Sequence, residues 1–358
     1  MAIIDKPTDY FNTVLWSGDN VDGRAITTGL ETNWTWAKRR NATNGFIIAD
    51  SVRGATYKLD SSTTNAEVNN YDGGHLESFT STGFTMGVGS GDFGHLNASG
   101  GTYVAWNWKA GTSFTNDASA TGIGSIDSTG SVNTTSGFSI CSYTGTGSAG
   151  TIKHGLSTAP KMIIWKNRSA TASWQVYHHT LPLSSGEYQA LQLNLTNVSA
   201  PFGTYNFMNA TAPTSTVFSL DGVPEMNGNG NSIIAYCFAE KQGYSKFGSY
   251  VGSNSGAYGP FIYTGFKPAF VLIKDSSAAN AWTIRDDKRN TYNPATNFLV
   301  PDSNAAEVTL GEAVDILSNG FKIKANGGKV QDSGNTYIYM AFAENPFVSS
   351  TGVPATAR

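Results

Sequence analysis

Charged side chains are scarce in this sequence. They make up 14% of its 358 residues, whereas about 25% is usual for a globular protein. The formal net charge is −3, and the one dense basic cluster is residues 38–40, so we expect no nucleic acid partner. No apolar run approaches the roughly 20 residues that cross a bilayer, so we expect no membrane insertion.

Cysteine and helix-forming runs are also lacking. Cys141 and Cys237 are the only two cysteines, too few for a disulfide framework or a zinc site, and the sequence does not say whether they pair. Residues 1–10 hold no apolar signal core, which indicates folding in a bacterial cytoplasm. Ser, Thr, Asn and 40 glycines replace the missing charges, and these residues serve short strands and tight turns. We therefore expect an all-β fold.

Four landmarks recur three times in the same order, which is the signature of an internal repeat. An opening strand ends in an aromatic residue two positions before a glycine, and an apolar run then ends in lysine. A short strand opens with an aromatic residue and reaches a polar residue four positions on, and an aromatic, apolar strand closes the segment. The lysines are Lys38, Lys166 and Lys274, the polar residues are Asp50, His178 and Asp286, and the closing aromatics are Trp108, Phe238 and Phe342.

The repeat predicts three tandem β-sandwiches of jelly-roll or concanavalin-like type, because short strands at regular spacing with glycine-rich turns favour that architecture. We assign the repeats to residues 1–110, 136–242 and 243–348. Residues 111–135 are rich in Ser, Thr and Gly, which predicts a linker, and residues 349–358 form a C-terminal tail. The opening and closing strands of each repeat should pair with each other.

The recurring carboxylates favour a structural interpretation. Asp50 and Asp286 each precede an arginine by three positions, Arg53 and Arg289. Glycosidases use paired carboxylates, but a set that occurs in two repeats fits a structural ion pair better than one asymmetric active site. We therefore expect two structural ion pairs.

Two adjacent histidines, His178 and His179, form the best catalytic or metal candidate. However, His178 stands where the other repeats have aspartate, and a metal site needs three or four convergent ligands. We therefore expect no catalytic residue, no metal and no cofactor, and we do not expect an enzyme.

Aromatic residues make up 12% of the chain and include the pairs Trp34/Trp36 and Trp106/Trp108. We expect that the two members of a pair do not face the same side, so that one of them covers a neighbouring repeat or a partner. Aromatic rings beside Asn, Asp and Ser also suit sugar binding. The candidate binding residues are Trp34, Trp106, Trp165, His178 and His179.

Several stretches resemble a repeat domain of virion proteins from marine bacteriophages, often labelled tail-fibre-like. They are KPTDYFNT at 6–13, YTGTG at 143–147, HGL at 154–156, APKMII at 159–164, IAYCFAE at 234–240 and AFAENPF at 341–347. Together they span nearly the whole chain. The resemblance implies a concanavalin-like or jelly-roll β-sandwich on a phage particle, and it brings no catalytic set with it.

We therefore expect a structural virion protein, namely a tail fibre or tail-associated appendage that binds the host surface. The alternatives are a head decoration protein, a polysaccharide-degrading tail enzyme and a calcium-dependent lectin. The expected partners are other virion proteins, further copies of the chain in a homotrimer, and a host surface glycan. The sequence leaves open which glycan is bound and which loops bind it.

Overall fold

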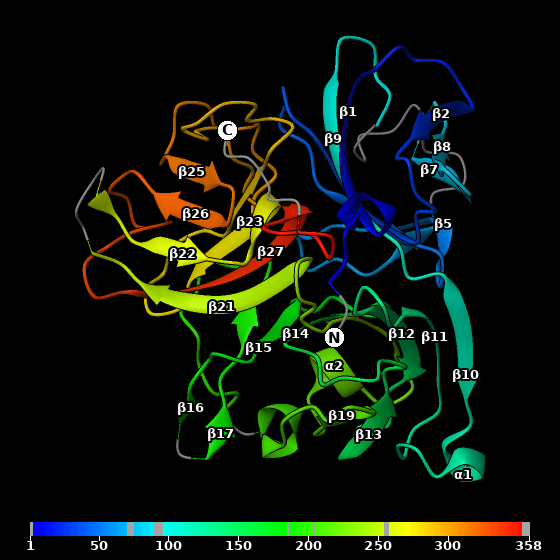
Figure 1. The fold of residues 1–358 in the computed structure, drawn as a ribbon. Helices are drawn as coiled ribbons and strands as arrows, with labels where there is room; N and C mark the ends of the chain where they lie inside the picture. The colour runs from blue at the N-terminus through cyan, green and yellow to red at the C-terminus, as the bar shows by residue number, and fades with distance from the viewer. Residues whose placement is uncertain are drawn as a thin grey trace.

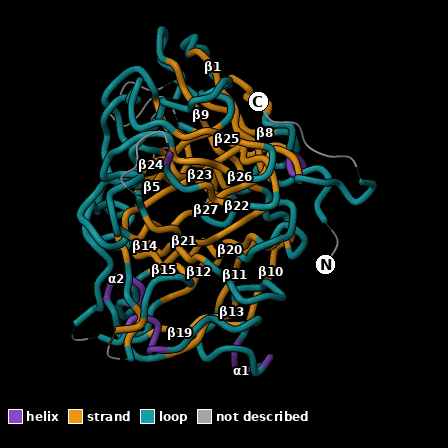
Figure 2. Tube along the Cα trace, turned by 60° about the vertical axis from the view of Figure 1, so that its left-hand side comes forward, coloured by secondary structure: helices purple, strands orange, loops and turns teal. Residues whose placement is uncertain are grey.

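The computed structural model describes residues 3–69, 75–88, 96–184, 186–203, 205–253 and 258–352. Three groups of strands lie around a common centre (Figure 1): β1–β9 at the upper right, β10–β20 below, and β21–β27 at the left. Nearly all of the secondary structure is antiparallel sheet, with only short helical turns between strands (Figure 2). These are η1 (Pro7–Asp9), α1 (Ala118–Thr121), η2 (Phe207–Ala210) and α2 (Pro224–Asn227). None of the described helices is long and apolar enough to span a membrane.

Three large sheets contain the same run of four strands. In each, the opening strand pairs with the closing strand, the closing strand with the strand of the landmark lysine, and that strand with a short fourth one. Large sheet 1 has β1 (Phe11–Ser17), β9 (Thr102–Trp108), β3 (Trp34–Arg39) and β4 (Ile47–Asp50). Large sheet 2 has β12 (Phe138–Thr144), β20 (Ser232–Phe238), β14 (Met162–Asn167) and β15 (Gln175–His178), and large sheet 3 has β21 (Ser245–Val251), β27 (Thr336–Pro346), β23 (Phe266–Asp275) and β24 (Thr283–Asp286). The predicted pairing of opening and closing strands is confirmed.

Further strands widen two of these sheets. Sheet 1 continues into β5 (Gly54–Leu59) and β6 (Val68–Asn69), and sheet 2 gains β18 (Leu191–Gln192) at one edge and β10 (Thr112–Asn116) with β11 (Ser128–Asn133) at the other.

The linker prediction for residues 111–135 is wrong, because this stretch forms β10, α1 and β11. An edge hairpin needs only one half-buried face, so a few apolar residues suffice. Phe114 and Val132 supply that face by packing against the core of sheet 2. The small residue Gly130 leaves room for the Phe114 ring, which a Cβ at this position would meet at 2.7 Å.

A smaller sheet covers one face of each large sheet. These are β2 (Arg24–Thr27), β8 (Gly83–Met86) and β7 (Leu76–Thr80) on sheet 1, β13 (Gly150–Lys153) and β19 (Val217–Leu220) on sheet 2, and β22 (Phe261–Tyr263), β26 (Gly320–Ile323) and β25 (Val314–Leu317) on sheet 3. The same pair lies at the centre of each small sheet: Ile26 opposite Phe84, Ile152 opposite Phe218, and Ile262 opposite Phe321. These pairs are buried between two layers, which is β-sandwich packing. A separate hairpin joins β16 (Leu183–Ser184) to β17 (Glu187–Tyr188).

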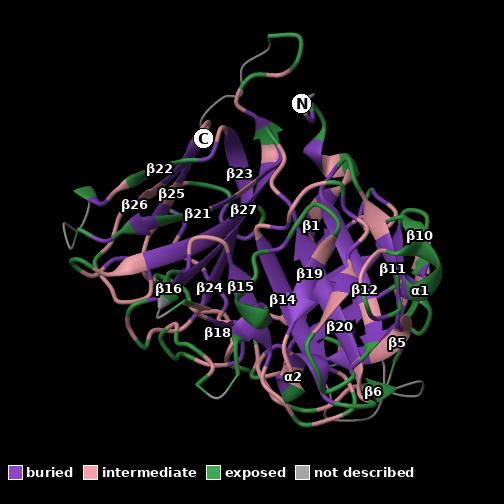
Figure 3. Cartoon of the chain, turned by 90° about the horizontal axis from the view of Figure 1, so that it is seen from below, coloured by how far each residue is buried: buried purple, intermediate pink, exposed green. Residues whose placement is uncertain are grey.

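The opposite faces of the three large sheets meet in one shared core, whose strands form the buried centre in Figure 3. Side chains alternate along a strand, so Trp106 and Trp108 face this core while Ala105 faces the small sheet. The three closing aromatics contact one another there. Their ring centroids lie 5.4 Å apart for Trp108 and Phe342, 6.1 Å for Phe238 and Phe342, and 6.4 Å for Trp108 and Phe238.

Two segments near the ends of the chain are in contact. Ser350, in the tail predicted for 349–358, donates its backbone N–H to Asp5 Oδ1 over 2.6 Å. Residues 353–358 of that tail lie outside the described residues. Both cysteines are buried and free rather than paired.

We expect Trp108→Ala to destabilise all three large sheets together, because the Trp108 ring contacts rings from each of them. The loss should be about 3–5 kcal/mol, the usual cost of removing a buried aromatic side chain. Urea unfolding followed by circular dichroism measures it, with Tyr292→Ala, at an 83% exposed position, as the control. A Trp108→Ala protein that unfolds in separate steps, with two of the large sheets as stable as before, would contradict the shared core.

Candidate functional site

The predicted aromatic binding residues lie in the interior. Trp34 is 1% exposed, and Trp106 and Trp165 are fully buried. Trp165 packs between large sheet 2 and its small sheet, whereas Trp34 and Trp106 belong to the shared core. The expectation that paired tryptophans face opposite sides is wrong, since residues two positions apart on a strand share a face. Trp36 and Trp108 accordingly lie in the same core as their neighbours. All these rings therefore serve packing.

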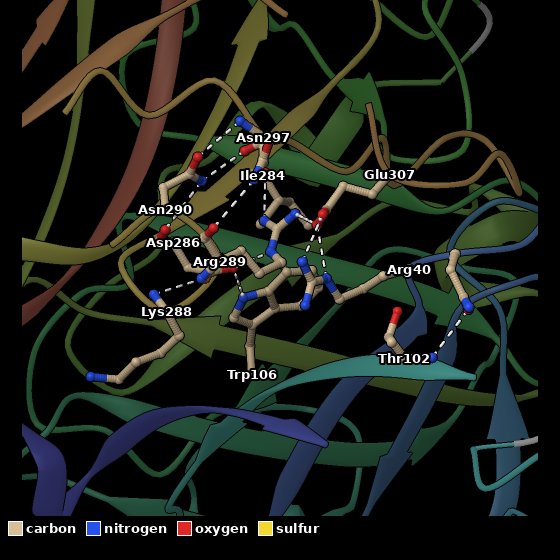
Figure 4. Close-up of polar contacts among 11 residues, drawn as sticks. Arg40, Thr102, Trp106, Ile284, Asp286, Lys288, Arg289, Asn290, Asn297 and Glu307 are labelled. Atoms are coloured by element: carbon tan, nitrogen blue, oxygen red, sulfur yellow. Dashed lines mark hydrogen bonds and ion pairs between the residues drawn. The ribbon is translucent and has the colours of Figure 1, made fainter. Parts of the chain in front are cut away.

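Asp286 closes β24 and lies in a buried ion-pair network between sheets 3 and 1 (Figure 4). Arg289 donates from Nε to Asp286 Oδ2 (2.6 Å) and from Nη1 to Glu307 Oε2 (2.7 Å). From sheet 1, Trp106 Nε1 donates to the same Asp286 oxygen (3.0 Å) and Arg40 Nη2 pairs with Glu307 Oε1 (2.9 Å). Burial lowers the pKa of Arg289, but the charges of Asp286 and Glu307 outweigh it and raise that pKa. The guanidinium therefore stays charged, and both carboxylates are occupied in neutralising it.

Asp50 forms the matching network between sheets 1 and 2. Arg53 donates from Nε to Asp50 Oδ2 (2.5 Å) and from Nη1 to Glu67 Oε2 (2.8 Å). From sheet 2, Tyr236 donates its hydroxyl to Asp50 Oδ2 (2.7 Å), and Arg168 Nη2 pairs with Glu67 Oε1 (2.7 Å). Both expected ion pairs, Asp50 with Arg53 and Asp286 with Arg289, are thus present. They hold the sheets together instead of offering an acid or a base to solvent.

His178 takes the matched position in sheet 2 and bonds to sheet 3. Its Nε2 lies 3.1 Å from the carbonyl oxygen of Tyr339, and its Nδ1 lies 2.8 Å from Thr180 Oγ1. Because a carbonyl only accepts, Nε2 carries the proton. Burial, with a smaller contribution from His179, lowers the pKa of His178 to about 3. His179 Nε2 likewise lies 3.1 Å from the carbonyl oxygen of Phe247. The two histidines are neutral connectors between sheets.

These contacts run in one direction around the molecule. Each polar landmark residue contacts the closing strand of the next large sheet: Asp50 contacts Tyr236, His178 contacts Tyr339, and Asp286 contacts Trp106. The landmark spacing indicated three equivalent positions, but it did not indicate that each would bond to a neighbouring segment.

The landmark lysines add a second cycle of contacts. All three are fully buried, and each ammonium donates to a backbone carbonyl of a neighbouring segment: Lys38 to Asn304 (3.2 Å), Lys166 to Thr64 (3.2 Å) and Lys274 to Thr196 (3.1 Å). Burial lowers the pKa of each to about 8. For Lys274, the charges of Asp275 and Asp302 offset part of that effect.

The best candidate for a binding surface is a pair of exposed aromatic residues that sequence reasoning missed. Phe261 and Tyr263 lie on the outer face of β22 and are 46% and 58% exposed, on either side of the buried Ile262. We call them the outer aromatic pair. The matched positions, on either side of Ile26 and Ile152, are Ala25 and Thr27 in β2 and Thr151 and Lys153 in β13. Comparison of the three strands in register is the signal that would have found the pair.

The outer aromatic pair is not required by the sheet beneath it. Aromatic rings can cover a cross-strand glycine, and Gly320 lies opposite Tyr263 and within reach of the Phe261 ring. However, Gly83 lies opposite Thr27 at the matched place in the small sheet on sheet 1, without an aromatic neighbour on strand β2. A small sheet of this kind can therefore form without aromatic residues at these positions, so packing alone does not explain Phe261 and Tyr263.

A family model described as a domain of unknown function, DUF7483, matches residues 6–346. This chain belongs to the DUF7483 family. No curated protein and no solved structure matches it. The match runs from just before η1 to the last residue of β27, so one DUF7483 domain contains all three large sheets.

We expect the stability of this DUF7483 domain to depend on pH through its three buried lysines. Their folded pKa of about 8 lies below the ordinary 10.5, so the unfolded chain binds more protons between these values. The free-energy cost of burying the charged lysines is at its full value below pH 8, and it decreases as the pH rises. The free energy of unfolding of Lys274→Met should therefore rise less than that of the native chain between pH 7.5 and 9.5.

Urea unfolding at the two pH values measures this difference. Burial raises the pKa of the Cys237 thiol, which opposes the effect of the lysines but is common to both proteins and cancels in the comparison. An identical pH dependence of the native chain and Lys274→Met would contradict a buried, cationic Lys274.

Proposed function

We propose that this chain is a structural component of a virion, in which three tandem jelly-roll or concanavalin-like sandwiches form one rigid body that binds a host surface glycan. The most favoured place is a tail fibre or a tail-associated appendage, with head decoration as the alternative. Other virion proteins are the expected partners, and we retain the homotrimer as part of the proposal. The virion location rests on the resemblance of the sequence motifs to phage tail-fibre-like repeats.

The outer aromatic pair is the observation that carries the binding function. Exposed aromatic residues are costly in water and are enriched where a protein meets a partner. Sugar rings present apolar C–H faces, which pack on aromatic rings, while the hydroxyl of Tyr263 and the ammonium of Lys322, opposite Phe261, are suited to bind sugar oxygens. Only one of three matched strands carries these side chains, which supports a role other than folding.

The repeated strand order supports the proposal of three copies. The same four strands occur in the same order in each large sheet, and matched residues form the central contacts. A body with one shared core has no hinge between its sandwiches, and a rigid body suits an appendage that transmits force to a particle.

A polysaccharide-degrading activity is the less favoured candidate. Its natural carboxylates would be Asp50, Asp286, Glu67 and Glu307, and each pairs with an arginine. Release of new reducing ends from host polysaccharide, lost in Asp50→Asn with folding intact, would overturn our preference for a binding protein.

The double variant Phe261→Ser/Tyr263→Ser tests the proposal. We expect its binding to host cells to be at least tenfold weaker, about 1.4 kcal/mol, with an unchanged melting temperature because both side chains are exposed. Tyr292→Ser, at another exposed tyrosine, is the matched control and should bind like the native chain. Flow cytometry with labelled protein measures the binding.

Two results would contradict the proposal. One is a double variant that binds host cells as well as the native chain. The other is absence of the protein from purified virions, as measured by mass spectrometry.

A further inference from the structure

A cavity of about 480 Å³ lies at the boundary between the second and third sandwiches. Ligand pockets usually have volumes of about 300–1,000 Å³. Of the eight described residues that line this one, six are apolar and the other two are the amides Gln192 and Asn197. Seven come from residues 190–202 of the second sandwich, and Ala279 comes from the third.

The matched positions at the other two boundaries hold an ion pair. Glu67 pairs with Arg168 between sheets 1 and 2, and Glu307 pairs with Arg40 between sheets 3 and 1. The backbone N–H of each glutamate also donates to the carbonyl of its arginine partner, over 2.9 Å and 2.8 Å.

At the cavity, serines replace both members of this ion pair. The backbone N–H of Ser199 donates to the carbonyl oxygen of Ser276 over 2.9 Å, so the backbone contact of the other boundaries is kept. The cavity opens beside it, between Val198, Ala200 and Ala279. The backbone contact between the two sandwiches is thus kept at this boundary. Only the charged side chains that connect the sheets at the other two boundaries are missing.

Hydrogen bonds between the two sandwiches hold the backbone around the cavity. Trp282 Nε1 donates to the carbonyl oxygen of Gln192 (3.0 Å), and Lys274 Nζ donates to that of Thr196 (3.1 Å). On the far side, the Phe202 ring stacks on Phe207 with centroids 5.3 Å apart. The lining is therefore fixed before any ligand arrives, which lowers the entropic cost of binding.

We propose that this cavity binds one uncharged sugar unit that carries a methyl group, such as an N-acetyl or 6-deoxy hexose. No charged side chain is among the eight described residues that line it, so a neutral ligand fits better than an ionic one. The Phe202 ring offers an apolar platform for the face of a sugar ring, and the alanines leave space for a methyl group. Asn197 Nδ2 lies 3.5 Å from Gln192 Oε1, so the two amides lie side by side and present donors and acceptors to hydroxyls.

This inference rests on the proposed glycan-binding function and adds a second site to it, separate from the outer aromatic pair. Saturation-transfer NMR with four probes tests it: N-acetylglucosamine and rhamnose, which carry a methyl group, glucose, which does not, and N-acetylneuraminic acid, which is charged. The native chain should bind the first two with millimolar dissociation constants and the last two at least fivefold more weakly.

Two variants locate the binding. Ala279→Tyr places a ring in the mouth of the cavity at an exposed position and should weaken binding of the first two probes at least tenfold. Phe202→Ala removes the platform and should have a similar effect. Ala305→Tyr, an exposed alanine near the boundary of sheets 3 and 1, is the matched control and should bind both probes like the native chain.

The probe-binding and cell-binding experiments test the cavity site and the outer aromatic pair separately. If Phe261→Ser/Tyr263→Ser loses cell binding but keeps probe binding, both proposals stand. If neither N-acetylglucosamine nor rhamnose binds the native chain, if glucose and N-acetylneuraminic acid bind as tightly as these two, or if Ala279→Tyr binds like the Ala305→Tyr control, the cavity proposal is overturned whatever the result for cell binding.

Discussion

The contact of three aromatic rings, Trp108, Phe238 and Phe342, is the constraint on which the rest of the structure depends. Each ring belongs to a closing strand, and each closing strand lies between the opening strand and the lysine strand of its own sheet. Bringing the three rings together therefore brings three sheets face to face. Each large sheet then has two buried faces, one toward its small sheet and one toward the centre, which explains why its closing strand is buried along nearly its whole length.

The polar groups of the interior follow from this arrangement. The polar residues that end the short strands β4, β15 and β24 are fully buried, so they need protein partners. Asp50, Asp286 and His178 find them on the next sheet, and the landmark lysines find backbone carbonyls. One boundary uses histidines and serines where the other two use carboxylates and arginines. That difference leaves the second–third boundary without the Glu–Arg ion pair of the other two, and it is where the cavity lies.

The β-fold and the pairing of opening with closing strands were predictable, because they depend on residue composition and on landmarks within each segment. The Asp–Arg pairs were predictable from their three-residue spacing. The shared core was not, since no local pattern states which face of a buried strand meets another segment. The strands at 112–116 and 128–133 were missed because an edge hairpin needs little apolar surface. Phe261 and Tyr263 could not be predicted, because aromatic residues are common in strands. Only comparison with the matched Ala25, Thr27, Thr151 and Lys153 distinguishes them.

The central claim is that the three large sheets share one core and unfold as one unit. Native-state hydrogen exchange of the amides in β9, β20 and β27 tests it most directly, because each closing strand belongs to a different large sheet. The most protected amides of all three strands should exchange with the same free energy, equal to that of global unfolding. A closing strand that exchanges through its own opening, at a clearly lower free energy than the other two, would contradict the claim.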